Sequence, residues 1–204
     1  MLKMIKGSCV PKPEMLSQGY EITDRNLIAN VDADNIRNII EGFLDMNKGL
    51  PLFLFIEVPA NIKDEKVIGE TEDGYVQLEA HHKDVYYLDG ISSEGLKQLL
   101  EPLYDILIND GLSSFGVGNP HGEEVGKYKY NEMILFSGEL QKYVPLFERN
   151  GVFRTDRLVT AWDTFTPDSP GASERYSDEK GRDIYSVTDY LKEVGMYRAE
   201  QRED

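Results

Sequence analysis

The chain has almost no cysteine, the residue that cross-links many small proteins. Cys9 is its only cysteine, so an intramolecular disulfide bond and a four-cysteine zinc site are both excluded. The longest apolar run, residues 50–56, is far shorter than the roughly 20 residues that span a bilayer. The N-terminus carries lysines but lacks the apolar stretch of a secretory signal. We therefore expect a cytoplasmic protein with no membrane contact.

Phosphate-binding motifs are also missing. Residues 115–126 are rich in glycine, but the glycine that follows Gly118 comes at Gly122, too late for a dinucleotide fingerprint. Pro120 removes an amide that a phosphate cradle would use, and no glycine-rich segment ends in Lys-Ser or Lys-Thr. We predict that residues 113–126 form a loop with a tight turn against a sheet, and we expect no cofactor.

Nucleophilic catalysis has no signature in this chain either. Cys9 lies in an extended stretch close to Pro11, where no helix N-terminus would lower the pKa of its thiol. A Gly-x-Ser-x-Gly elbow is absent. We assign no catalytic residue from the sequence.

Negative charge is what the chain has in excess. The 37 acidic residues outnumber 22 lysines and arginines, which gives a net charge of −15, and residues 1–50 contribute only −1 of it. Such a surface repels nucleic-acid phosphates and anionic lipids, so we expect neither as a partner. Two interpretations stay open: the charge keeps the protein soluble, or an acidic face docks a basic partner by electrostatic steering.

Three histidines raise the alternative of a metal site. His81 and His82 are adjacent and His121 lies in the glycine-rich segment, two residues before Glu123. Zinc-type sites need several imidazoles and carboxylates to converge, and neighbours on a strand point to opposite faces. The alternative hypothesis is a small metal-dependent hydrolase that uses His121, Glu123 and one of the paired histidines.

Hydrophobic periodicity predicts the first half of the fold. Apolar residues at helical spacing favour a helix over residues 33–48, followed by an apolar strand over 52–58 in which Glu57 is the one charge. Residues 66–79 are typical of a hairpin that turns at the Asp73-Gly74 pair. A further strand is expected over residues 85–88.

The second half is predicted to contain more helix. A helix over residues 92–110 should kink at Pro102, a third lies near 140–147, and the last begins at Ser186. Strands are expected over 127–136 and 158–166.

Together these elements predict an α+β fold. We expect a single mixed domain over residues 1–197, with an antiparallel or mixed sheet of five to six strands and three to four helices. Residues 198–204 contain no large apolar side chain and are predicted to form a frayed acidic tail.

The profile favours a non-catalytic interaction protein, such as an immunity or antitoxin-type inhibitor of a basic partner. Acidic residues in the predicted turns would place carboxylates over cationic groups of that partner. Trp162 has two interpretations, an interface anchor beside the long loop at 166–181 or a buried core residue. The predicted partner-binding residues are Glu70, Glu72, Asp73, Glu123, Glu124 and Trp162.

Overall fold

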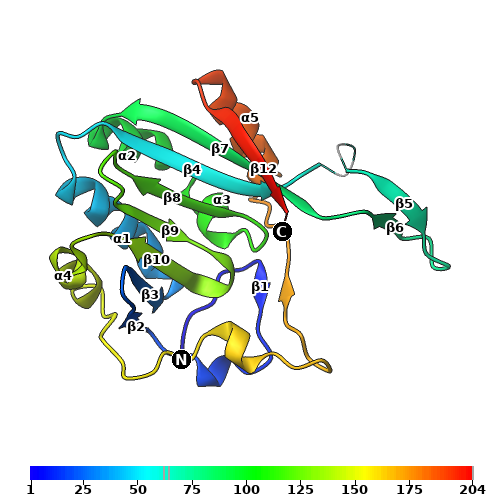
Figure 1. Ribbon diagram of the computed structural model, residues 1–204, viewed down its shortest axis with the longest axis horizontal. Coiled ribbons are helices and arrows are strands. Elements are labelled where there is room, and N and C mark those ends of the chain that lie inside the picture. The colour runs from blue at the N-terminus through cyan, green and yellow to red at the C-terminus, as the bar shows by residue number, and fades with distance from the viewer. Residues whose placement is uncertain (62, 64, 204) are drawn as a thin grey trace.

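An antiparallel sheet of eight strands is the frame of the molecule in the computed structural model, which describes residues 1–61, 63 and 65–203 (Figure 1). The α+β class is confirmed, whereas the expected sheet of five to six strands was too small. Across the sheet the order is β12 (Tyr197–Glu203), β7 (His82–Ile91), β4 (Leu52–Pro59), β8 (Ser114–Gly118), β9 (Glu124–Lys127), β10 (Glu132–Phe136), β3 (Asn26–Asn30) and β2 (Gly19–Ile22).

Two small sheets accompany the large one. The first pairs β1 (Ser8–Cys9) with β11 (Ala172–Ser173). The second is a hairpin of β5 (Val67–Glu70) and β6 (Val76–Leu78), which projects away from the large sheet in Figure 1.

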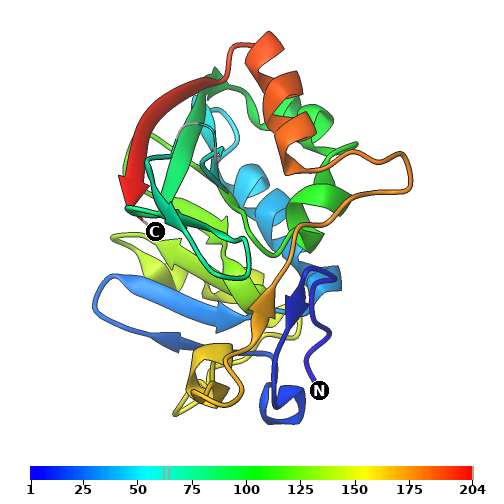
Figure 2. The same cartoon turned by 90° about the vertical axis from the view of Figure 1, so that its right-hand side faces the viewer.

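Helices cover one face of the large sheet and leave the other open, as Figure 2 shows with the strands to the left of the helices. In the described residues the α-helices are α1 (Ala33–Met46), α2 (Ser93–Leu100), α3 (Tyr104–Asn109), α4 (Val144–Glu148) and α5 (Ile184–Glu193). Short 3-10 turns occur at Pro13–Met15, Lys129–Asn131, Leu140–Lys142 and Ala161–Thr164. None of these helices combines the length and the apolar character that crossing a membrane requires.

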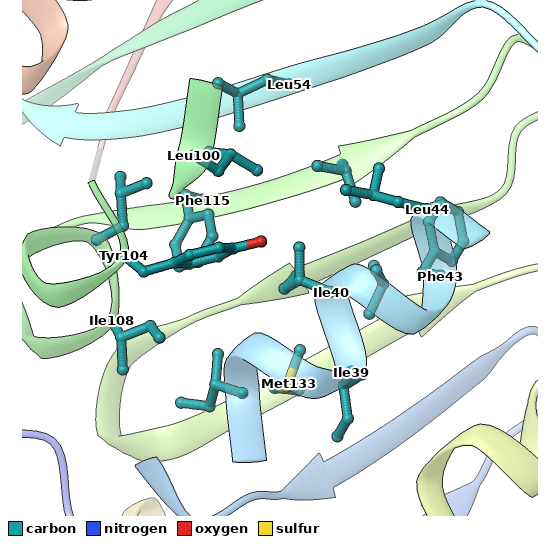
Figure 3. Close-up of a cluster of buried hydrophobic side chains, with 14 of the residues drawn as sticks. Ile39, Ile40, Phe43, Leu44, Leu54, Leu100, Tyr104, Ile108, Phe115 and Met133 are labelled. Carbon is teal, nitrogen blue, oxygen red and sulfur yellow. The ribbon is translucent and has the colours of Figure 1, made fainter. Parts of the chain in front are cut away.

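The main core lies between α1 and the sheet (Figure 3). Its helical side is the predicted apolar stripe, in which Ile36, Ile40 and Phe43 are fully buried. Phe115 of β8 and Met133 of β10 lie opposite, also fully buried. Because the stripe is continuous at i, i+3, i+4 and i+7, it fixes which face of α1 meets the strands.

Pro102 separates two helices instead of kinking one. Helix α2 ends at Leu100 and α3 begins at Tyr104, with a turn between them. Proline lacks the amide that would continue the helical ladder, so the chain restarts one turn later.

Three segments differ from the predictions. Residues 113–126 form the β8–β9 hairpin with a turn at 119–122, not a loop, because the glycines allow close strand pairing. The strand expected over 127–136 is interrupted by Tyr130 and Asn131, whose positive φ angles of 56° and 65° break its extension. Residues 158–166 contain a 3-10 turn at Ala161–Thr164 and no long strand.

The C-terminal residues were predicted to fray, but they form a strand. Residues 197–203 form β12 and pair antiparallel with β7, with Tyr197 opposite Tyr87; Asp204 is outside the described residues. Arg198 and Gln201 both donate to Asp84, at 3.2 and 3.1 Å. Backbone pairing needs no large apolar side chain, so the polar composition of this segment does not prevent a strand.

Candidate functional site

The β5–β6 hairpin, which we call the arm, holds three of the predicted partner-binding residues. Glu70, Glu72 and Asp73 are all exposed at its tip, where the chain turns through Gly74. Gly74 has a φ of 82°, the left-handed conformation that favours glycine in this turn. Between residues 66 and 79 the arm carries four acidic side chains and one lysine.

Large apolar side chains accompany these carboxylates on the arm. Val67 and Ile68 on one strand are 55% and 60% exposed, and Tyr75 and Val76 on the other side of the turn are 72% and 46% exposed. Among the described residues, the arm pairs with no strand of the large sheet. It therefore presents an exposed apolar patch next to an acidic tip, which is a composition typical of a contact surface.

A cleft of about 520 Å³ lies where the arm joins the body. His82 donates its backbone amide to Glu65 at 2.8 Å, and its Nδ1 lies 2.6 Å from the same carboxylate. This side-chain hydrogen bond lowers the pKa of Glu65. The side chains of His81, Arg175, Leu112 and Tyr185 also line the cleft.

Of the three histidines of the metal hypothesis, His121 lies apart from the paired His81 and His82. Pro59 of β4 pairs with Lys83, next to His82, whereas Phe53 pairs with Gly118, near the turn that holds His121. These two positions are six residues apart on β4, or about 20 Å at roughly 3.3 Å per residue. Within the described residues, no group of three or more histidines, cysteines, aspartates and glutamates is placed to hold a metal ion.

The carboxylate of Glu123 is hydrogen-bonded to neighbouring side chains of the same chain. Asn119 and the Tyr143 hydroxyl each donate to its carboxylate at 2.8 Å, and the Nζ of Lys142 lies 3.2 Å away. Burial alone would raise the pKa of Glu123, but these hydrogen bonds lower it below its usual value. Its side chain is only 13% exposed. Glu123 therefore ties the β8–β9 turn to the segment before α4.

Glu124, its neighbour, lies on the open face of the sheet. Burial, aided by the negative charge of Glu57, raises the pKa of Glu124 above its usual value. Glu57 itself is paired with Arg202 of β12 at 3.0 Å. Burial likewise raises the pKa values of Tyr87 and Tyr128, and the Glu124 charge adds to both shifts. The open face thus gathers charged and aromatic side chains from separate strands.

The sequence did not predict that Glu57, Tyr87, Glu124 and Arg202 would lie together on the open face. Glu57 stood out only as the charge within an apolar strand, and Arg202 fell in the segment that was predicted to fray. The signal that could have found it is the alternation of Phe53, Phe55 and Glu57 along β4. These residues occupy the face opposite Leu54 and Ile56, which are fully buried under the helices.

Trp162 lies on the surface, 52% exposed, and is not a core residue. Its ring makes an edge contact with Tyr130, with ring centroids 5.0 Å apart, and another with Phe165 at 5.4 Å. Tyr130 belongs to a second, smaller hydrophobic cluster that also contains Leu2 and Leu16. Trp162 covers the edge of that cluster and leaves half of its surface open to solvent.

Comparisons of the chain with protein-family models, with curated proteins and with solved structures found no match.

Proposed function

We propose that this chain is a non-catalytic, cytoplasmic interaction protein of the immunity or antitoxin type, which binds a basic partner through the arm. The observation that supports this most directly is the pairing of exposed apolar side chains with an acidic tip on one projecting hairpin. A protein that inhibits by binding needs such a surface and no catalytic group of its own.

The apolar side chains supply the contact area. Ile68 and Tyr75 are among the most exposed large hydrophobic residues of the chain, and tyrosine is enriched among the residues that anchor interfaces. Burying them against a partner removes apolar surface from water, which favours the complex.

The acidic tip supplies the choice of partner. Glu70, Glu72 and Asp73 make no ion pair within the described part of the chain, so their charges are available to a partner. Carboxylates at such a position attract lysine and arginine side chains and speed association at low salt. They would occupy the cationic groups with which a nuclease, for example, holds phosphate.

A salt-dependent capture experiment with a matched variant tests this proposal. Tagged wild-type protein and a variant with Glu70→Gln, Glu72→Gln and Asp73→Asn are each mixed with lysate of the source cells at several salt concentrations. We expect the wild type to retain a basic protein that salt releases, and the variant to retain much less of it. Retention that is equal for both proteins, or that does not change with salt, would contradict the proposal.

A further inference from the structure

A small cavity opens on the face of the sheet that no helix covers. Its volume is about 280 Å³, and its walls are Phe53, Asn119, Gly122, Glu124 and Phe136. Pockets for drug-sized ligands hold roughly 300–1,000 Å³. This cavity therefore suits a group of a few heavy atoms better than a whole cofactor.

The cavity is built from one row of residues across four strands. Phe136 of β10 pairs with Glu124 of β9, Glu124 pairs with Gly118 of β8, and Gly118 pairs with Phe53 of β4. Directly paired residues point to the same side of a sheet. The Glu124 carboxylate thus stands between two phenylalanine rings on the open face.

Gly118 makes the room for this arrangement. A Cβ atom added there would lie 2.2 Å from Cζ of Phe53, so the ring of Phe53 lies over the space that a side chain would fill. Any larger residue at this position would push the ring away from its place beside Glu124.

In the part of the chain that the structure describes, the carboxylate of Glu124 is left without a hydrogen-bond or ion-pair partner of its own. Among the residues that the structure describes, none donates a hydrogen bond to its carboxylate or forms an ion pair with it. The nearby cation, Arg202, is already held by Glu57 at 3.0 Å and by Glu200 at 2.6 Å. Burial makes the ionised carboxylate of Glu124 costly, and the charge of Arg202 offsets only part of that cost, because the pKa of Glu124 stays raised.

We propose that this cavity binds an organic cation, namely an alkylammonium or guanidinium group of the size of a lysine or arginine side chain. The faces of aromatic rings attract cations, and the carboxylate supplies the counter-charge. A neutral apolar group would bury the carboxylate without a partner, and an anion would be repelled. The site is lined by no residue of the arm, so it does not rest on the proposed function.

Proton competition adds a second signature. The groups that interact with Glu124 are Glu57 from β4, Arg202 from β12, Tyr87 from β7 and Tyr128 after β9. A bound cation favours the ionised carboxylate, so affinity should fall as the pH drops through the raised pKa of Glu124.

An NMR titration of the full-length protein tests the proposal. The probes are Nα-acetyl-arginine amide and Nα-acetyl-lysine amide, and the neutral analogue Nα-acetyl-citrulline amide is the control ligand. We expect the two cations, but not citrulline, to shift the backbone amide signals of Gly118, Gly122 and Glu124 with a millimolar dissociation constant. The Glu124→Gln variant should bind them at least ten-fold more weakly.

Glu132→Gln is the matched control variant. It removes the same charge from the same sheet face but lies outside the cavity wall, so affinity should stay within two-fold. A well-dispersed spectrum shows that each variant is folded. Equal shifts with citrulline, or unchanged affinity in Glu124→Gln, would overturn the proposal.

n-Butylammonium distinguishes the two sources of such a cation. If it binds as tightly as the lysine amide, the site takes a free amine; if it binds several-fold more weakly, the site takes a side chain that a polypeptide presents. Either result supports a cation site, whereas no shift with any of the three cations at 50 mM would refute it.

Discussion

The Nζ atom of Lys127 lies 2.5 Å from the carbonyl oxygen of Asp110, 17 residues earlier in the chain. It also donates to the carbonyl of Ser113 at 3.2 Å, and its side chain is fully buried. Asp110 follows the last residue of α3, where unpaired carbonyls give a helix its partial negative end. The lysine therefore fastens β9 to the end of that helix.

The first prediction concerns the pH dependence that this lysine creates. Burial lowers the pKa of Lys127 from its usual 10.5 to about 8, although the charge of Asp110 opposes the shift. Between these two values the unfolded chain holds a proton that the native protein has lost, so stability rises with pH. We expect the unfolding free energy of the wild type to increase relative to that of Lys127→Met across this range. Urea unfolding of both proteins from pH 7.5 to 10.5 measures this difference in unfolding free energy. A difference that does not change with pH would contradict the lowered pKa of Lys127.

The second prediction concerns Glu123. Its alanine variant removes the carboxylate that accepts from Asn119 and Tyr143 and leaves them only Asn47 Oδ1 as a shared acceptor, which should cost about 1–3 kcal/mol of stability at neutral pH. Because the folded pKa is lowered, this contribution is present above the unfolded value near 4.5 and disappears as the pH falls through the folded one. Chemical denaturation between pH 2 and 7 is the measurement, with Glu124→Ala as the neighbouring control. If Glu123→Ala lowered the unfolding free energy by the same amount at low pH as at neutral pH, the proposed role of the ionised Glu123 carboxylate would be contradicted.

The third prediction separates charge from contact area on the arm. Removing the three carboxylates of the tip should slow association with the basic partner, whereas Ile68→Ser and Tyr75→Ser should mainly speed dissociation. Surface plasmon resonance at two salt concentrations distinguishes the two effects.

Its control is a variant with Glu14→Gln, Glu179→Gln and Glu193→Gln, which removes the same charge at exposed positions away from the arm. We expect association close to that of the wild type. If the control slows association as much as the tip variant, net charge and not the arm governs binding.

The fourth prediction compares two glycines. A Cβ added at Gly116 would lie 2.4 Å from the carbonyl oxygen of Val125 and 2.6 Å from Cα of Gly126, both backbone atoms that cannot move aside. Gly116→Ala should therefore destabilise the protein by about 1–3 kcal/mol. A Cβ added at Gly138 would meet no atom within 4 Å among the described residues beyond its chain neighbours, so Gly138→Ala should change stability by less than about 0.5 kcal/mol. Thermal melts of both variants measure the difference. Equal melting temperatures for Gly116→Ala and Gly138→Ala would contradict the close approach of the Gly116 and Val125 backbones.

The fifth prediction concerns the last strand. A chain that ends at Met196 loses β12, which exposes the edge of β7 and removes Arg198 and Gln201 from the buried Asp84. We expect faster hydrogen exchange at the β7 amides that bond to β12 and a lower melting temperature. Exchange in β10, four strands away in the order of the sheet, serves as the internal control. Unchanged protection in β7 would mean that β12 is not paired in solution.

Local sequence pattern was enough for the elements that carry their own signal. The stripe of α1 and the apolar run of β4 lie where periodicity places them, and Asp73-Gly74 turns the arm as predicted. In these segments the spacing of apolar residues and the turn chemistry act over a few residues, so no distant contact is needed to determine them.

The sequence could not show which side chains meet across strands. Glu123 and Glu124 are identical in type and adjacent, yet one is satisfied by Asn119 and Tyr143 and the other lies alone between two phenylalanines. Because side chains alternate along a strand, the two glutamates point to opposite faces of the sheet. Only the register of the neighbouring strands determines which residues each of them contacts.

Composition alone determined the acidity of this chain and its single thiol, and the spacing of apolar residues determined the stripe of α1 that packs into the core. The tertiary structure decided that the polar C-terminal segment becomes a strand, that Lys127 is buried and that His121 lies far from His82. These outcomes depend on backbone pairing between segments distant in sequence, and backbone groups are the same for every residue except proline. A pattern of side chains therefore carries little information about them.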